Sequence, residues 1–389
     1  MKWRAAPRSV YVVAMPRDNN ISSGLEGVVA ATTRLSHVDG EAGELIIAGF
    51  PVGELAAHAT FEETTWLLWH GELPTEAELR EFRTELAAHR ALPPATLALL
   101  RECARAGIDS MDALRIALDT VSLVSTEAVA IVALAPTIVA AFARLSAGKE
   151  PIAPRTDLGH AENYLYLLSG EVPGVERVRG LETYLNTVID HGLNASTFTC
   201  RVITSTGSDL VSAVVGAIGA LKGPLHGGAP GPALETVFEI GDASRAEEVL
   251  RGKIEAGERL MGFGHRVYKV RDPRADVLAV AAERLYMRGG DMRLYTLARA
   301  IEQTAIRLLE EYKPGRRLQT NVEFYTALLL HGLGLEVPLF TPTFAIARVS
   351  GWIAHAFEQR AANRLIRPRS EYVGPHDRRW QDRGAVAIG

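Results

Sequence analysis

Apolar residues recur along most of the chain at spacings of three and four, the period of a helix that buries one face. One such stripe predicts a long helix that ends near Arg367–Pro368, because proline stops a helix; it consists of Ile346, Val349, Ile353 and Phe357. Residues 210–221 predict another helix, whereas strand-like runs are short, as in Gly43–Ile47. The pattern therefore predicts a mainly α fold.

Two of the predicted helices, Ala128–Ala143 and Leu210–Leu221, are apolar on almost every side. A helix without a polar face must be buried all round. The first contains Pro136 and is shorter than the ~20 residues that a bilayer span needs, so we expect a buried helix and no membrane contact. Two interpretations stay open for these helices, the core of one protomer or an interface between two copies.

Proline and glycine cluster in two places, Gly223–Pro232 and Gly332–Pro338. A chain of 389 residues ordinarily divides into more than one domain, and no low-complexity linker is visible. These breaks predict a small domain, residues 226–333, inserted into a large domain made of residues 1–225 and 334–389.

Composition and charge narrow the function classes. Hydrophobic residues make up 47% and charged residues 23%, and the formal net charge is -4. Without a basic field we expect no nucleic-acid partner. The N-terminal residues lack a secretory pattern, so a cytoplasmic location is expected.

The sequence contains two cysteines, Cys103 and Cys200, which lie far apart and outside any Cys-x-x-Cys pattern. Neither a disulfide framework nor a zinc knuckle is indicated. We expect both to be buried as small apolar residues.

Three histidines stand in turn-prone, glycine-rich frames: Asp190-His191-Gly192, Gly223-Pro224-Leu225-His226-Gly227-Gly228 and Gly262-Phe263-Gly264-His265-Arg266. Glycine removes side-chain bulk and permits positive φ, so an imidazole and the backbone can both approach a ligand. Three imidazoles also suit zinc, but their spacings of 35 and 39 residues lack a paired motif such as His-x-x-x-His. We therefore predict one active site without a metal.

Longer motifs around these histidines resemble the citrate synthase family. They are Asp190-His191-Gly192-Leu193-Asn194-Ala195-Ser196-Thr197, the Gly-Pro-Leu-His-Gly-Gly-Ala turn and the Gly-His-Arg-Val-Tyr-Lys…Asp-Pro-Arg segment, which occur in the family's order between about Gly24 and Gly374. The resemblance implies a helical two-domain fold, a homodimer and a place in the tricarboxylic acid cycle. It implies an acyltransferase that condenses acetyl-CoA with oxaloacetate and hydrolyses the citryl thioester, with CoA as a co-substrate and no permanently bound cofactor.

The resemblance also assigns roles to residues. Glu323 matches the base that takes the thioester methyl proton, His226 the donor to the enolate oxygen, and His265 the donor to the ketone of oxaloacetate. Oxaloacetate binding falls to one histidine and three arginines, which match carboxylates as a bidentate fork, namely His191, Arg274, Arg348 and Arg367.

Some assignments reach beyond this centre. Arg367 is expected to enter the neighbouring subunit's site, and Lys269 and Arg271 match cations that approach the CoA phosphates. Asp209, Asp272 and Glu235 are interpreted as helix caps or solvated charges.

The chain departs from the family at the base. Most citrate synthases carry Pro-Asn-Val-Asp-Phe-Tyr, whereas this chain has Thr320-Asn321-Val322-Glu323-Phe324-Tyr325. The extra methylene moves the carboxylate by ~1.5 Å, and a misplacement of ~1 Å can cost ~10²-fold in rate. We favour an active citrate synthase. The alternatives are 2-methylcitrate synthase, which uses propionyl-CoA, and a non-catalytic CoA- or dicarboxylate-binding homologue.

Overall fold

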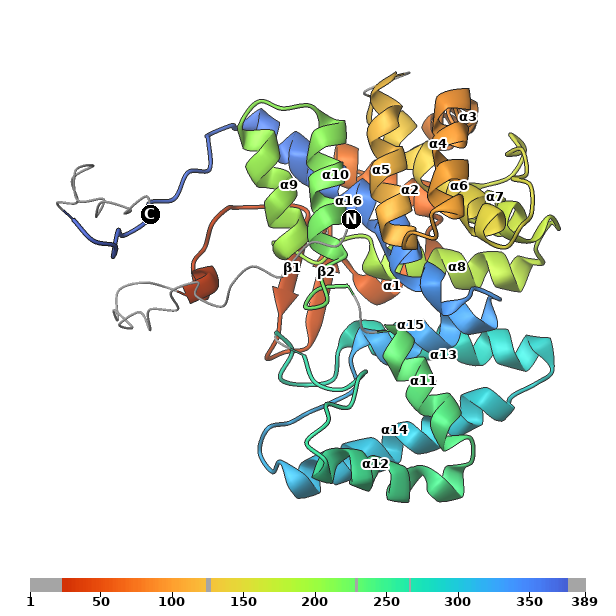
Figure 1. The fold of residues 1–389 in the computed structure, drawn as a ribbon, viewed down its shortest axis with the longest axis vertical. Helices are drawn as coiled ribbons and strands as arrows, with labels where there is room; N and C mark the ends of the chain where they lie inside the picture. Colours follow the sequence, from red (N-terminus) through yellow and green to blue (C-terminus); the bar gives the residue numbers. More distant parts are fainter. Residues whose placement is uncertain (1–22, 124–126, 228–229, 266, 377–389) are drawn as a thin grey trace, which may run out of the picture. The chain divides into compact units, whose positions relative to one another are not determined.

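The computed structural model describes residues 23–123, 127–227, 230–265 and 267–376. Two motif residues, Gly228 and Arg266, lie outside the described residues. The described part is mostly helical, with one small sheet, which confirms the predicted fold class (Figure 1).

The first helices of the chain are α1 (Val52–His58), α2 (Phe61–His70), α3 (Glu76–Ala88), α4 (Pro94–Arg105), α5 (Ser110–Asp119), α6 (Ala128–Ser146), α7 (His160–Ser169) and α8 (Val175–Val188). The later ones are α9 (Ala195–Ser205), α10 (Leu210–Leu221), α11 (Pro230–Ile240), α12 (Ala246–Glu255), α13 (Pro273–Gly289), α14 (Arg293–Tyr312), α15 (Val322–Gly332) and α16 (Phe340–Ala361). Short 3-10 turns are η1 (Ser23–Leu25), η2 (Thr120–Leu123), η3 (Ala243–Arg245) and η4 (Val337–Leu339). The strands are β1 (Ser36–Asp39), β2 (Glu44–Ile47) and β3 (Phe50–Pro51).

The sheet is antiparallel in the order β1-β2-β3, with Ser36 opposite Ile47. Strand β2 confirms the run predicted at residues 43–47, and its alternate side chains Leu45 and Ile47 are buried. Ser36 starts β1 and directs its hydroxyl towards the segment that follows α8. The sheet thus supports a site built mainly by helices.

Helix α6 is the buried helix predicted from the apolar run at 128–143. Its length and composition alone would allow it to cross a membrane, but 78% of its most apolar window is buried inside the protein. It packs against α4, α5, α7 and α16. A second candidate arises only if α15 and the segment Val337–Ala361, bent by 117°, are counted as one span. Helix α6 is therefore a core helix of the protomer.

Helix α16 carries the predicted stripe, but it ends at Ala361 and not near Arg367–Pro368. Asn363 explains the early end, because its side chain donates to the Ser205 carbonyl oxygen and accepts from Gln359 Nε2. Asparagine competes with the helix for such backbone hydrogen bonds. The proline predicted to stop the helix therefore lies beyond its actual end.

Helix α16 approaches the residues after α8 very closely. A side chain at Gly351 would place its Cβ 2.2 Å from the Ile189 carbonyl oxygen, so only glycine fits there. This contact brings α16 beside His191.

The described residues divide into two compact units, one within residues 33–365 and the other made of residues 23–32 and 366–376. Within residues 33–365, helices α11 to α15 lie together at the lower end in Figure 1. The division into domains 1–225 with 334–389 and 226–333 stays a prediction.

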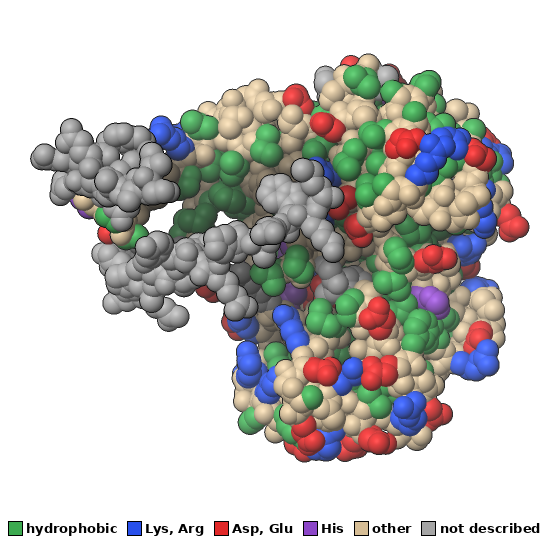
Figure 2. Space-filling view, viewed as in Figure 1, with side chains coloured by type: hydrophobic (Ala, Val, Ile, Leu, Met, Phe, Trp, Pro, Cys, Tyr) green, Lys and Arg blue, Asp and Glu red, His purple; other side chains and the backbone are tan. Residues whose placement is uncertain are grey.

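Charged side chains of both signs are interspersed over most of the face shown in Figure 2. This distribution agrees with the absence of a basic field in the composition. Cys103 and Cys200 are both buried and unpaired with each other, as predicted.

Candidate active site

His191 lies in the turn between α8 and α9. The preceding Asp190 is fully buried, accepts a hydrogen bond from Ser36 Oγ at 2.5 Å and lies 3.1 Å from His355 Nε2 on α16. His191 Nε2 is 3.0 Å from the hydroxyl of Tyr268. Burial, then the charges of Arg274 and Arg348, hold the pKa of His191 well below its usual value. This imidazole is therefore neutral at pH 7.

His265 follows a loop that only glycine permits, since Gly262 and Gly264 have φ of 88° and 79°. Its Nδ1 accepts the backbone N–H groups of Val267 and Tyr268 at 3.0 and 3.1 Å. These bonds assign the proton of the neutral ring to Nε2. Burial, then Arg274, lowers the pKa to about 4, so His265 presents a neutral N–H donor.

His226 lies in the turn after α10. Its Nε2 accepts the backbone N–H of Ser196 at 3.3 Å and lies 2.8 Å from the Ser196 hydroxyl. The neutral ring thus carries its proton on Nδ1, for which the structure records no partner among the described residues. Burial, then Arg348, lowers the pKa to about 4. His226 is the second neutral donor of the site.

Glu323 occupies the first turn of α15. Asn321 caps this helix by accepting the Glu323 N–H at 3.0 Å, and its amide donates to the Gly264 carbonyl oxygen at 2.9 Å. The base is therefore tied to the loop that carries His265. Burial raises the pKa of Glu323 to about 7, although Arg274 opposes the shift.

Two predicted arginines are buried near these groups. Arg274 is held by both oxygens of Asp272, at 3.0 and 2.8 Å, and its Nη2 is 3.4 Å from His265 Nε2. Both nitrogens are donors, so they are placed to share an acceptor that a ligand would supply. Arg348, 2% exposed, donates its Nε to the Val188 carbonyl oxygen and forms no ion pair within the described part of the chain.

The predicted residues of one unit converge. The rings of His191 and His265 are 5.8 Å apart, and both pack on Tyr268. The field of Arg348 acts on His191 and His226, and that of Arg274 acts on Glu323. The three histidines, two arginines and Glu323 therefore form one site.

The outlying predicted residues stand apart from this cluster. Arg367 belongs to the unit made of residues 23–32 and 366–376, so its role stays a prediction. Lys269 is exposed, and its backbone N–H donates to the Gly40 carbonyl oxygen. Arg271 pairs with Asp276 and Glu302. The predicted CoA contacts of Lys269 and Arg271 stay predictions.

Supporting residues were missed because their importance depends on contacts distant in sequence. Tyr268 touches His191, Ser196 holds His226, and Asp190 joins β1 to α16. The interpretation of Asp272 as a cap is confirmed, since it accepts the Arg274 N–H at 3.0 Å, but it is fully buried and not solvated. The sequence Asp272-Pro273-Arg274 could have indicated the pairing of Asp272 with Arg274.

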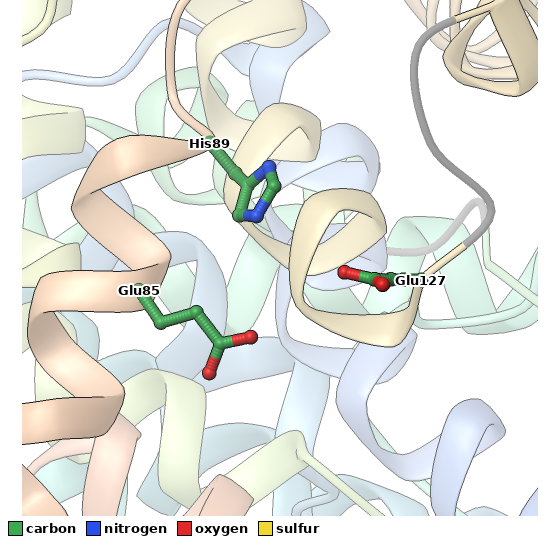
Figure 3. Close-up of side chains that lie close together, drawn as sticks. All are labelled: Glu85, His89 and Glu127. Atoms are coloured by element: carbon green, nitrogen blue, oxygen red, sulfur yellow. The ribbon is translucent and has the colours of Figure 1, made fainter.

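One group among the described residues could hold a metal ion, and it does not include the site histidines. Figure 3 shows Glu85 and His89 one turn apart at the end of α3, and Glu127 facing them from the start of α6. Their ligand atoms lie within 4.8 Å of one another. The group is largely exposed, and its elements carry none of the catalytic candidates.

Comparisons of sequence point to one family. The model described as "Citrate synthase, C-terminal domain" matches residues 24–369. Citrate synthase 2 of Bacillus subtilis is 41% identical over 369 residues, covering 92% of this chain and 97% of that protein. The 2-methylcitrate synthase of Mycobacterium tuberculosis strain H37Rv is 39% identical over 388 residues, covering 96% of each.

Solved structures agree. Citrate synthase from Pyrobaculum aerophilum has a TM-score of 0.84 and 39% identity, covering 92% of this chain and 94% of that one. Citrate synthase from Thermoplasma acidophilum, solved as a ternary complex with carboxymethyl coenzyme A and oxaloacetate, has a TM-score of 0.84 at 31% identity, covering 92% of this chain and 98% of that one.

Proposed function

Since the chain belongs to the citrate synthase family and has its helical two-domain fold, we propose that its own reaction joins acetyl-CoA, rather than propionyl-CoA, to oxaloacetate. The enzyme is an acyltransferase that forms a carbon–carbon bond. The relatives include proteins named citrate synthase and a protein named 2-methylcitrate synthase. The choice between the two thioesters therefore depends on this chain's own residues.

Enolate formation requires a base and a donor. Glu323 takes a proton from the thioester methyl group, and its pKa of about 7 suits a base that works near neutral pH. His226 donates its Nδ1 proton in a hydrogen bond to the developing enolate oxygen. Because Ser196 holds the other ring nitrogen, the donor is aimed before substrate binds.

Carbon–carbon bond formation requires an activated ketone. The enolate carbon attacks the ketone carbon of oxaloacetate while His265 gives its Nε2 proton to the ketone oxygen, which becomes the hydroxyl of the product. Water then cleaves the thioester and releases CoA. Arg274 and Arg348 supply positive charge for the carboxylates of oxaloacetate, and His191, oriented by Tyr268, binds beside them.

The observation that carries the proposal is the matched pair of neutral histidines. In His265 and in His226, backbone N–H groups engage one ring nitrogen and leave the other to donate. A pair of fixed neutral donors suits two oxygens that gain negative charge during the reaction.

We expect a higher kcat/KM with acetyl-CoA than with propionyl-CoA when CoA release is measured at saturating oxaloacetate. One additional methylene changes apolar binding by about 1–3 kcal/mol, which corresponds to about 10- to 200-fold in kcat/KM. Reactions without oxaloacetate control for simple thioester hydrolysis. A preference for propionyl-CoA would identify a 2-methylcitrate synthase.

The protein is also proposed to act as a cytoplasmic homodimer in which Arg367 enters the partner's site. Helix α10 supports this proposal, because a side made of small residues remains partly exposed in the protomer although the helix is apolar. That side includes Val215, Gly216, Gly219 and Ala220. A second copy would bury it.

Mixing two inactive variants tests the shared site. Arg367→Ala and His226→Ala are each expected to lose most activity, whereas a mixed dimer contains one site with both residues intact. After subunit exchange has been confirmed by mass spectrometry, up to about half of the parent activity per mixed dimer should return. No recovery from confirmed mixed dimers would exclude the contribution of Arg367 across the interface.

A further inference from the structure

Glu302, on α14, is a buried carboxylate outside the reacting centre. It is 2% exposed and accepts four hydrogen bonds. Oε1 accepts from Arg271 Nη1 at 2.6 Å and from Thr320 Oγ1 at 2.7 Å. Oε2 accepts from Arg299 Nη1 at 2.8 Å and from the Tyr325 hydroxyl at 2.6 Å. Every oxygen of this side chain is therefore occupied twice.

This arrangement keeps Glu302 ionised. Burial opposes the charge, but hydrogen bonds from Tyr325 and Thr320, together with Arg271, hold the pKa of Glu302 below its usual value. A buried carboxylate is costly unless it is paired and hydrogen-bonded, and here both conditions hold. Charge-assisted bonds are also the stronger ones. The ionised Glu302 side chain thus holds its hydrogen-bond partners in fixed positions.

Two of the hydrogen-bond partners of Glu302 immediately precede the N-terminal caps of α13 and α15, the helices that carry Arg274 and Glu323. Arg271 precedes Asp272, which caps α13 and clamps Arg274. Thr320 precedes Asn321, which caps α15 and holds the backbone of Glu323.

The two helix starts are also joined directly, since Asp272 Oδ2 accepts the Val322 N–H at 3.2 Å. Glu302 contacts the residue on the outer side of each cap. Glu302 therefore fixes the N-terminal ends of α13 and α15 on the side away from the site, while Asp272 and Asn321 fix them on the side that faces it.

We propose that Glu302 is a positioning residue: by binding Arg271 and Thr320 it fixes the starts of α13 and α15, and so sets Glu323 relative to Arg274 and His265. The inference rests on the proposed function, in which Glu323 is the base. Glu302 contacts no reacting group and acts through Thr320 and Asn321. If the base is displaced by ~1 Å, the site should still bind oxaloacetate, but it should turn over ~10²-fold more slowly.

Two variants separate this role from folding. Glu302→Gln keeps the size but places an NH₂ group against two donors, so at least one pair of bonds is lost. Thr320→Val is nearly isosteric and removes only the hydroxyl that bonds to Glu302, leaving the Arg271 ion pair in place. Glu310→Gln, an exposed position on the same helix, is the matched control.

The expected result is a fall in kcat of about 10- to 100-fold in both variants, with a KM for oxaloacetate within roughly threefold of the parent. The acid limb of the kcat profile should also move to lower pH, because a loosened Glu323 is less buried and its pKa falls towards that of an ordinary glutamate. Circular dichroism and Tm confirm that the compared proteins are folded. Glu310→Gln should match the parent in every respect.

The outcomes are distinguishable. An active parent with folded variants that keep its kcat and acid limb would overturn the positioning role. So would a loss of activity that only follows the unfolded fraction, with the acid limb unmoved. A parent without turnover would contradict the proposed function itself, together with the inference that rests on it.

Discussion

The Glu323→Gln variant is expected to form citrate about 10²- to 10⁴-fold more slowly than the parent, the usual loss when a positioned base is removed. Glutamine keeps the size of the side chain and cannot accept the methyl proton. Oxaloacetate should still bind almost normally, because its proposed ligands are the histidines and arginines. Stopped-flow CoA release and a thermal shift with oxaloacetate give the two quantities.

Folding does not confound this variant. Since the pKa of Glu323 is raised to about 7, its ionisation opposes folding as the pH rises from about 4.5 towards 7. The Tm of Glu323→Gln at pH 8 should therefore equal or exceed that of the parent. Glu336→Gln, an exposed glutamate after the same helix, serves as the control. An unchanged kcat in Glu323→Gln would exclude Glu323 as the base.

The same pKa fixes the pH dependence of the parent. Glu323 works only when ionised, so kcat should decline as the pH falls below about 7. Glu323→Asp should also lose activity if the backbone has adjusted to the longer acid. An aspartate variant faster than the parent would show that Glu323 is a poorly placed base.

The Arg348→Met variant is expected to raise the KM for oxaloacetate by about 30- to 5,000-fold, the equivalent of the ~2–5 kcal/mol lost when one partner of a buried charge pair is removed. Arg348 lacks an ion-pair partner within the described part of the chain, and burial lowers its pKa to about 10. Its guanidinium thus suits a substrate carboxylate. Methionine keeps an unbranched apolar side chain and removes the charge, together with the contact of the guanidinium group with the Phe344 ring.

The Tm of the free protein distinguishes a role of Arg348 in substrate binding from a structural role. An unpaired buried cation destabilises the free protein, so Arg348→Met should leave Tm unchanged or higher in the absence of oxaloacetate. Arg360→Met, at an exposed position of α16, should alter neither quantity. A fall in Tm with an unchanged KM would assign Arg348 a structural role and none in substrate binding.

Local patterns accounted for much of the fold. Helix α10 was predicted with its observed bounds, because an all-apolar run between Asp209 and Lys222 has clear ends. The end of α16 was wrong, because the side chain of Asn363 contacts Ser205, far away in the sequence. Such long-range hydrogen bonds leave no periodic signal.

The site shows the same division. Motifs identified His191, His226, His265 and Glu323, since glycines and a cap mark them locally. The sequence could not reveal that Ser196 sets the tautomer of His226 or that Glu302 bonds to Thr320, because those contacts arise only when helices pack. Motifs therefore predict which groups react, and the fold determines the protonation state and the orientation of those groups.

The most direct test of the account is to incubate the purified protein with acetyl-CoA labelled with ¹³C at the methyl carbon, together with oxaloacetate, and to quantify labelled citrate and free CoA. The account predicts that both appear in equal amounts, that the label enters citrate, and that neither forms without oxaloacetate. Binding of oxaloacetate, seen as a thermal shift, without any labelled citrate from the purified protein would contradict it and would leave a ligand-binding homologue.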